Sequence, residues 1–220
     1  SGGVELSIFS DLLFDRLLIN DGQGNFSDSN QKLPDIDNRI STGVVTSGDI
    51  DNDGDIDLFV GERVKIGNYG LPGSGFILIN DGEGNFSNET EIFAPDLKDL
   101  GMITDAVFTD LDSDNKLDLI IVGEYMGIRV FKNVNNNFVP IMNSLAEEKG
   151  WWNSIHLEDL NNDGKLDILA GNHGLNSRFR ASKIKPLKLY FNDFDKNGFG
   201  EGVICFTSEE GKDFPYALRH

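Results

Sequence analysis

Cysteine and basic residues are scarce in this chain. With one cysteine in 220 residues, the chain cannot form an internal disulfide, which excludes a disulfide-stapled fold. It has 19 Lys and Arg against 37 Asp and Glu, and this deficit argues against a nucleic-acid partner, which needs a basic face. No stretch approaches the ~20 consecutive apolar residues of a transmembrane helix. What remains is an acidic chain, of net charge −18, that is long enough to bury a core.

Fifteen of the acidic residues lie in four nine-residue loops that share one spacing, at 49–57, 110–118, 159–167 and 193–201. Each loop has oxygen-bearing side chains at positions 1, 3, 5 and 9, and Gly or Asn at position 6. Carboxylates on alternate residues of a tight loop converge on one point, and Ca²⁺ takes roughly 6–8 oxygen ligands. Position 6 must turn sharply, which suits Gly or Asn. One such run is typical of an ordinary acidic turn, but four copies predict calcium sites.

The predicted cofactor is therefore Ca²⁺, and the predicted ligands occupy positions 1, 3, 5, 7 and 9 of every loop. The fourth loop differs most from the others, because its position 5 is Asn and its flanks are unlike theirs. The predicted ligands are Asp49, Asp51, Asp53, Asp55 and Asp57; Asp110, Asp112, Asp114, Lys116 and Asp118; Asp159, Asn161, Asp163, Lys165 and Asp167; and Asp193, Asp195, Asn197, Phe199 and Glu201.

These loops are not EF-hands. An EF-hand needs a bidentate Glu at position 12 and a helix on each side, whereas position 12 here is Val60, Ile121, Ala170 or Ile204. Short runs rich in β-branched and apolar residues, closed by Gly, flank the first three loops and are typical of strands. Cysteine-stapled calcium repeats are excluded by the single cysteine. Each loop is therefore predicted to join two antiparallel strands.

A second motif alternates with the first. Residues 17–27 recur almost unchanged as residues 77–87, and a less similar copy follows at 130–138. Asp-Gly between two apolar runs is a strong hairpin signal. The repeating unit is thus strand, calcium loop, strand, connection, strand, Asn/Gly turn and strand. Four antiparallel strands in a long repeat are typical of a propeller blade.

The repeat predicts an all-β fold with β-propeller-type blades of four antiparallel strands, about three and a half blades in all. Because strands alternate in direction, all four calcium loops are expected on one face. Incomplete arrays expose sheet edges, so we expect a segment of a longer chain, or edges covered by self-association. The predicted divisions are an N-terminal lead-in at 1–14, a half blade at 15–30, blades at 43–90 and 105–142, a blade with two calcium loops at 152–207, and a C-terminal tail at 208–220.

The first loop with its flanks, residues 48–61, resembles the FG-GAP/VCBS repeat family. The turn at 18–26 and the stretch 172–179 are similar to the branch that includes cartilage acidic protein and many large exported bacterial proteins. The resemblance covers roughly residues 15–215 and implies a calcium-stabilised β-propeller in an extracellular, periplasmic or cell-surface location. After the second strand of each unit the chain has residues 61–63, 123–125 and 171–173 in place of the Phe-Gly and Gly-Ala-Pro signatures of the family, which argues against an integrin-like mode of ligand binding.

The face opposite the calcium loops is the predicted ligand surface. Aromatic, Arg and carboxylate side chains there suit an extracellular glycan or protein ligand, although core packing and ion pairs within the loops would equally explain them. An alternative is a polysaccharide-processing, lyase-like enzyme or its accessory domain, with His173 as general base; no catalytic residue is assigned, because no nucleophile–base pair is evident. The predicted ligand-binding residues are Glu62, Glu124, Tyr125, Trp151, Trp152, His173, Arg178 and Arg180.

Overall fold

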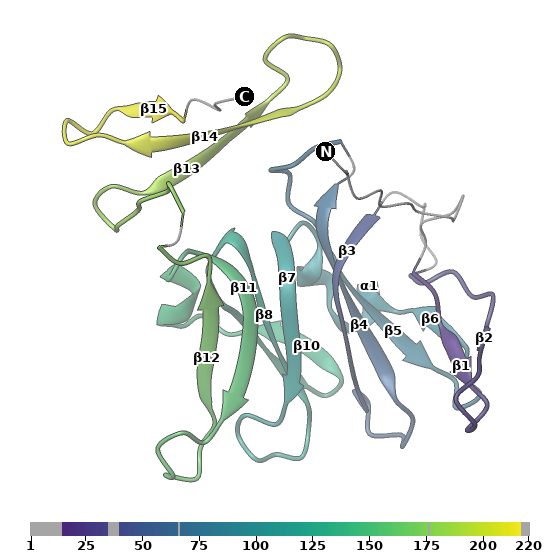
Figure 1. The fold of residues 1–220 in the computed structure, drawn as a ribbon. Helices are drawn as coiled ribbons and strands as arrows, with labels where there is room; N and C mark the ends of the chain where they lie inside the picture. Colours follow the sequence, from purple (N-terminus) through teal and green to yellow (C-terminus); the bar gives the residue numbers. More distant parts are fainter. Residues whose placement is uncertain (1–14, 35–39, 66, 176, 217–220) are drawn as a thin grey trace.

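The computed structural model describes residues 15–34, 40–65, 67–175 and 177–216, and these residues form an all-β fold (Figure 1). The expected N-terminal lead-in at 1–14 lies outside the described residues. All pairings between the named strands of the described part are antiparallel. The all-β class predicted from the repeat pattern is confirmed. None of the helices in this part of the chain is long and apolar enough to span a membrane.

The region predicted as a half blade, residues 15–30, forms a hairpin, and the region predicted as the first whole blade, residues 43–90, belongs to a four-stranded sheet. The hairpin pairs β1 (Leu18–Asn20) with β2 (Phe26–Asp28). The sheet has the order β3-β4-β5-β6. In it the first acidic loop joins β3 to β4, and the Asn/Gly turn joins β5 to β6. Its strands are β3 (Ile40–Gly48), β4 (Asp57–Lys65), β5 (Gly75–Asn80) and β6 (Phe86–Asn88).

The next four strands, β7 to β10, pair in sequence order as β3 to β6 do. Strand β8 pairs with β7 on one side and β9 on the other, and β9 pairs with β10. Short helices connect the sheets, namely α1 (Thr90–Phe93), η1 (Pro95–Leu97) and, after β10, η2 (Ser144–Glu147). The strands are β7 (Met102–Thr109), β8 (Asp118–Met126), β9 (Arg129–Val134) and β10 (Asn137–Pro140).

The last unit departs from the predicted blade at 152–207. Strands β11 (Gly150–Glu158) and β12 (Asp167–Asn172) form a hairpin, and β11 also pairs with β8 through Gly150↔Met126 and Trp151↔Glu124. Strands β13 (Leu187–Asn192), β14 (Glu201–Thr207) and β15 (Asp213–Pro215) form a separate sheet. Strand β15 lies in the region predicted as a C-terminal tail.

Because β13 and β14 belong to the separate sheet, the fourth acidic loop lies at a different end of the molecule from the other three. Figure 1 shows the β13–β14 loop at the end of the molecule opposite the loops that follow β3, β7 and β11. The expectation that all four loops share one face is therefore corrected. The reason is the long connection between β12, which ends at Asn172, and β13, which begins at Leu187. This connection allows β13 to pair in a sheet that does not contain β12. Its sheet packs instead on the segment after β4, where Gly70 meets the side chains of Leu189 and Phe191 and the Gly200 amide bonds Asn68 Oδ1 at 3.3 Å.

The core lies on both faces of the sheet that contains β8. Alternate residues of a strand point to opposite faces, so Leu119 and Ile121 pack with Phe59 of β4, whereas Ile120 and Val122 pack toward β11 and β12. All four of these β8 side chains are fully buried. The strands β7 to β10 thus lie between β3–β6 on one side and the β11–β12 hairpin on the other, and β11 joins their sheet through its pairing with β8. The outer sheets remain partly open, and Leu169 on β12 is 59% exposed.

Candidate functional site

The four acidic loops share one hydrogen-bonded backbone. In each loop the position 1 carboxylate accepts the amides of positions 5 and 6, and the position 9 carboxylate accepts the amide of position 2. The distances lie between 2.8 and 3.2 Å. These bonds fold each loop around its own acidic side chains. The carboxylates that accept these amides at positions 1 and 9 are those of Asp49 and Asp57, Asp110 and Asp118, Asp159 and Asp167, and Asp193 and Glu201.

Two positions of every loop have left-handed backbone. Position 6 was predicted to turn sharply, and its φ is 97° at Gly54 and 63° at Asn115. Position 4 is also left-handed, with φ of 61° at Asn52 and Ser113 and 62° at Lys196. The pattern in the sequence did not reveal position 4, because among the Asn, Ser and Lys residues that occupy it only Asn commonly adopts this conformation. Ser113 and Lys196 occupy position 4 in the second and fourth loops, and neither residue type predicts a left-handed backbone.

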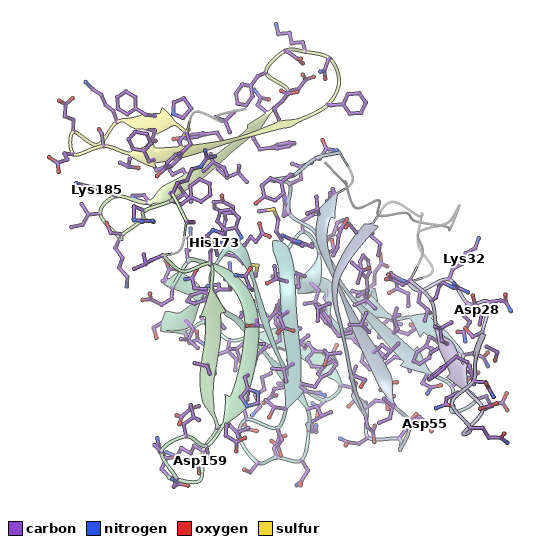
Figure 2. The ribbon with its side chains drawn as sticks, viewed as in Figure 1. Asp28, Lys32, Asp55, Asp159, His173 and Lys185 are labelled. Atoms are coloured by element: carbon purple, nitrogen blue, oxygen red, sulfur yellow. The ribbon has the colours of Figure 1, made fainter. Side chains whose placement is uncertain are left out.

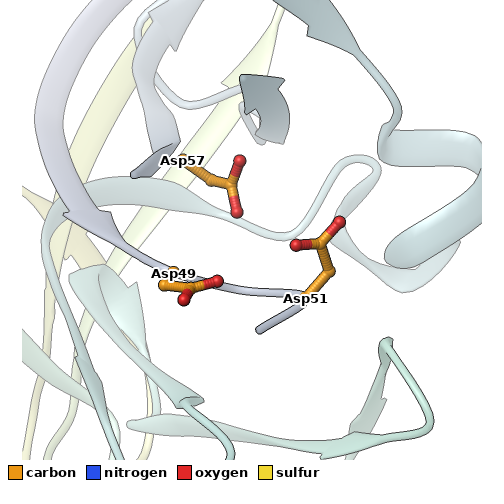
Figure 3. Close-up of side chains that lie close together, drawn as sticks. All are labelled: Asp49, Asp51 and Asp57. Atoms are coloured by element: carbon orange, nitrogen blue, oxygen red, sulfur yellow. The ribbon is translucent and has the colours of Figure 1, made fainter. Parts of the chain in front are cut away.

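The first loop gathers three carboxylates around a common space (Figure 3). Ligand oxygens of Asp49, Asp51 and Asp57 lie within 4.8 Å of one another. Asp51 Oδ1 is buried and has no hydrogen-bond partner. Burial, followed by the nearby charge of Asp53, raises the pKa of Asp51, and burial raises the pKa of Asp57. An orphaned carboxylate oxygen among other hard oxygens fits a site for Ca²⁺.

The second loop gathers Asp110, Asp112 and Asp114 in the same way. Asp118 stays at the base of this loop, where burial raises its pKa and its Oδ1 accepts the amide of Asn133 at 2.9 Å. A basic side chain enters this loop from β9. Lys132 Nζ donates a hydrogen bond to Asp112 Oδ2 and lies 3.8 Å from Asp114 Oδ2.

The third and fourth loops differ from each other. In the fourth, oxygens of Asp193, Asp195 and Glu201 lie within 4.8 Å of one another. Among the described residues, the three acids of the third loop form no such group. Asn161 takes position 3 there, and its Oδ1 accepts the Asp163 amide at 2.8 Å. At position 7, residues Lys116, Lys165 and Phe199 have only a backbone carbonyl to offer to calcium.

The end opposite the first three loops carries a cluster of rings. His173 lies at this end, away from Asp55 and Asp159 (Figure 2). Its ring is stacked on Trp151, with centroids 4.5 Å apart. Tyr125 and Phe179 lie 5.2 and 5.8 Å from Trp151. Tyr125 has a φ of 58°, which is unusual for a bulky residue and marks a strained position.

The ring cluster borders a cavity of about 810 Å³. Tyr125, Trp151 and His173, which were predicted as ligand residues, line this cavity. Glu148 and Lys183 also line it and form an ion pair of 2.6 Å. The structure thus brings aromatic surface and charged groups of both signs to one hollow.

Two other predicted ligand residues are buried carboxylates. Glu124 is 2% exposed and lies between two sheets, where Arg63 binds its Oε1 at 2.5 Å and Tyr69 OH donates to its Oε2 at 2.6 Å. Glu62 is 3% exposed, and its Oε2 accepts the Ser74 amide at 3.0 Å. Both side chains join structural elements, and neither of them lines the cavity.

The remaining three predicted ligand residues are also used within the protein. Trp152 packs against the β8 core, and its Nε1 donates to the Glu148 carbonyl at 3.2 Å. Arg178 lies 5.2 Å from the centroid of the Phe179 ring. Arg180 donates to the carbonyls of Ser177 and Phe179.

The sequence reasoning missed two members of the ring cluster. Phe179 lies edge-on to Tyr216, with centroids 5.0 Å apart, and Arg178 lies 5.8 Å from the centroid of the Tyr216 ring. Phe179 closes the stretch 172–179 that carried a family resemblance, but the resemblance assigned it no role, and Tyr216 falls in no repeat or periodic run. Phe179 and Tyr216 extend the aromatic surface from Trp151 on β11 to the residue that follows β15.

Comparison with known proteins identifies one part of the chain. Residues 110–170 match the family model described as the FG-GAP-like repeat. This segment runs from the second acidic loop through the third loop to β12. No curated protein matches the chain. Residues 110–170 therefore carry an FG-GAP-like repeat, and the match supports the FG-GAP family for this chain.

Proposed function

We propose that this chain is a calcium-binding, β-propeller-type repeat segment of an exported or cell-surface protein that acts in extracellular recognition. The observation that carries the proposal is the shared loop backbone, which in the first loop surrounds the buried, unpartnered Asp51 Oδ1. Three loops hold carboxylate oxygens within 4.8 Å of one another. Such oxygens repel one another unless a cation neutralises them. The FG-GAP-like match at 110–170 supports the same assignment.

In this proposal calcium supplies positive charge and joins the two strands that each loop connects. The oxygen-bearing Asp, Asn and Glu side chains at positions 1, 3, 5 and 9 would hold it, together with the backbone carbonyl of position 7. Extracellular calcium modules work at roughly 10⁻⁴–10⁻³ M, so such sites fill outside the cell rather than in the cytosol. This affinity range is the reason for the proposed extracellular, periplasmic or cell-surface location.

The cavity beside Trp151 is the proposed recognition surface. Rings combined with charged groups suit a glycan or a protein ligand, because an apolar face packs while polar groups at its edge bind hydrogen-bonding partners. Trp151 already contacts three rings, at 4.5 to 5.8 Å between centroids. It is thus held in place before a ligand arrives, which reduces the entropy that binding costs.

Thermal unfolding during a calcium titration tests the metal assignment, with Mg²⁺ and EDTA as controls. A ligand that binds only the folded state raises the unfolding midpoint as its concentration rises. We expect a rise with Ca²⁺ and a much smaller one with Mg²⁺. An unchanged midpoint at millimolar calcium would show that the loops are acidic turns.

Glycan-array and pull-down binding test the recognition assignment. We expect Trp151→Ala to abolish binding without loss of fold, and Phe26→Ala, which removes a 62% exposed ring elsewhere, to leave binding intact. Equal binding by both variants would place the ligand elsewhere. Turnover of uronic-acid glycans that is lost in His173→Ala would favour the lyase alternative.

A further inference from the structure

The first and second acidic loops differ in the strand that supports them. Asn80 on β5 donates its backbone amide to Asp57 Oδ1 at 2.9 Å, and Asn133 on β9 donates to Asp118 Oδ1 at the same distance. These two Asn residues are therefore structural equivalents, and so are the residues that precede them. The residue before Asn80 is Ile79, which packs against the core. The residue before Asn133 is Lys132.

Lys132 reaches into the second loop. Its Nζ donates a hydrogen bond to Asp112 Oδ2 and lies 3.8 Å from Asp114 Oδ2. These two aspartates stand at positions 3 and 5 of the loop, where the proposed calcium ion needs their oxygens. The Lys132 side chain is 34% exposed, so its ammonium group can turn away from the loop and be hydrated by solvent. Ile79, the equivalent residue beside the first loop, carries no charge.

An ammonium group and Ca²⁺ cannot share the same two carboxylate oxygens, because the two cations repel each other at that distance. Calcium must first displace Lys132, whereas it meets no such competitor from the equivalent position beside the first loop. Without calcium, the ammonium partly neutralises the carboxylates that would otherwise repel one another.

We propose that Lys132 is a built-in competitor of calcium at the second loop. This inference rests on the proposed calcium function. The second loop then binds calcium more weakly than it would with a neutral residue at position 132, and it keeps its shape better when calcium is absent. The two loops would therefore fill at different calcium concentrations, although their ligand spacing is the same.

Calorimetric titration of the whole chain with CaCl₂ tests the proposal in the wild type and in Lys132→Met. We expect one site to bind about two- to fivefold more tightly in Lys132→Met, which is the range for removing one solvent-exposed ion pair. In EDTA we expect Lys132→Met to unfold at a lower temperature than the wild type. Lys65→Met is the matched control, because it removes an ion pair of similar exposure, to Asp99, outside the acidic loops; its calcium affinities should match the wild type.

The Asp110→Asn substitution shows which loop is affected. Asp110 holds two backbone amides of the second loop, so its loss should remove this site and with it any difference made by Lys132→Met. A gain that persists in the double variant would overturn the proposal, as would equal calcium affinities in the wild type and Lys132→Met. Absence of calcium binding in every variant would instead overturn the calcium function itself.

Discussion

The side-chain amide of Asn133 donates a hydrogen bond of 2.9 Å to the backbone carbonyl of Ile50, a residue of the neighbouring sheet's acidic loop. Asn133 is 1% exposed, and its backbone amide also bonds Asp118 Oδ1. One buried residue therefore joins position 2 of the first loop to position 9 of the second. A buried polar contact of this kind fixes the two loops relative to each other.

We expect Asn133→Ala to lower the free energy of unfolding by about 1–3 kcal/mol, because the Ile50 carbonyl loses its partner in a buried place. Asn80→Ala is the matched control. Both Asn side chains accept amides of the turn that follows them, but the amide group of Asn80 bonds the carbonyl of Ile56 at an exposed position, so its loss should cost less. Urea unfolding of both variants measures the difference. Equal costs would mean that the bond between the sheets adds nothing.

Asp51→Asn should have opposite effects with and without calcium. Burial and the neighbouring Asp53 raise the pKa of Asp51, so its ionised form is unfavourable in the calcium-free protein. An amide of the same shape removes this charge, and we expect an equal or higher melting temperature in EDTA. In calcium the variant lacks a ligand charge, and its midpoint should fall below the wild type by about 2–4 °C.

Asp96→Asn is the control for Asp51→Asn, because Asp96 is an exposed carboxylate outside the acidic loops. Its small effect should be the same in EDTA and in calcium. Differential scanning calorimetry in the two buffers gives the comparison. If Asp51→Asn changes the midpoint equally in both, Asp51 is not a calcium ligand.

The sequence predicted the repeating unit better than the arrangement of its last copy. Ligand spacing and the Asp-Gly turns are local signals, so the loops and hairpins from β3 to β10 could be placed from them. The departure of β13 from the sheet depends on its packing against Gly70, which is more than a hundred residues earlier. No local pattern encodes such a contact. For the same reason the partners of Glu124, which are Arg63 on β4 and Tyr69 in the segment after it, could not be predicted from the strand of Glu124 itself.

The buried Glu62 carboxyl should make stability depend on pH. Burial raises its pKa above the ordinary value of 4.5. A carboxyl whose folded pKa is raised adds stability below its unfolded pKa, and this stability is lost as the pH rises through the folded pKa. We therefore expect Glu62→Gln to melt higher than the wild type at pH 7 and nearly the same at pH 4. Melting curves across this range test it, and a constant difference at all pH values would contradict it.

Arg63 and Glu124 form an ion pair that joins β4 to β8. Glu124 is buried, whereas the Arg63 side chain is 49% exposed. Removing Arg63 leaves a buried carboxylate with only Tyr69 as its partner, and such uncompensated burial costs more than the ion pair gains. We expect Arg63→Met to lower the free energy of unfolding by about 2 kcal/mol, less than for a fully buried pair, because water reaches one side.

A double-mutant cycle separates the ion pair from the other contacts of these residues. Glu124→Gln keeps the shape of the side chain and removes its charge, so adding it to Arg63→Met should restore much of the lost stability. Tyr69→Phe, which removes one hydrogen bond to Glu124, should cost only about 1 kcal/mol. Additive losses in the double variant would show that the charge of Glu124 does not need Arg63. Recovery of stability would show that the loss in Arg63→Met comes from the uncompensated buried charge of Glu124.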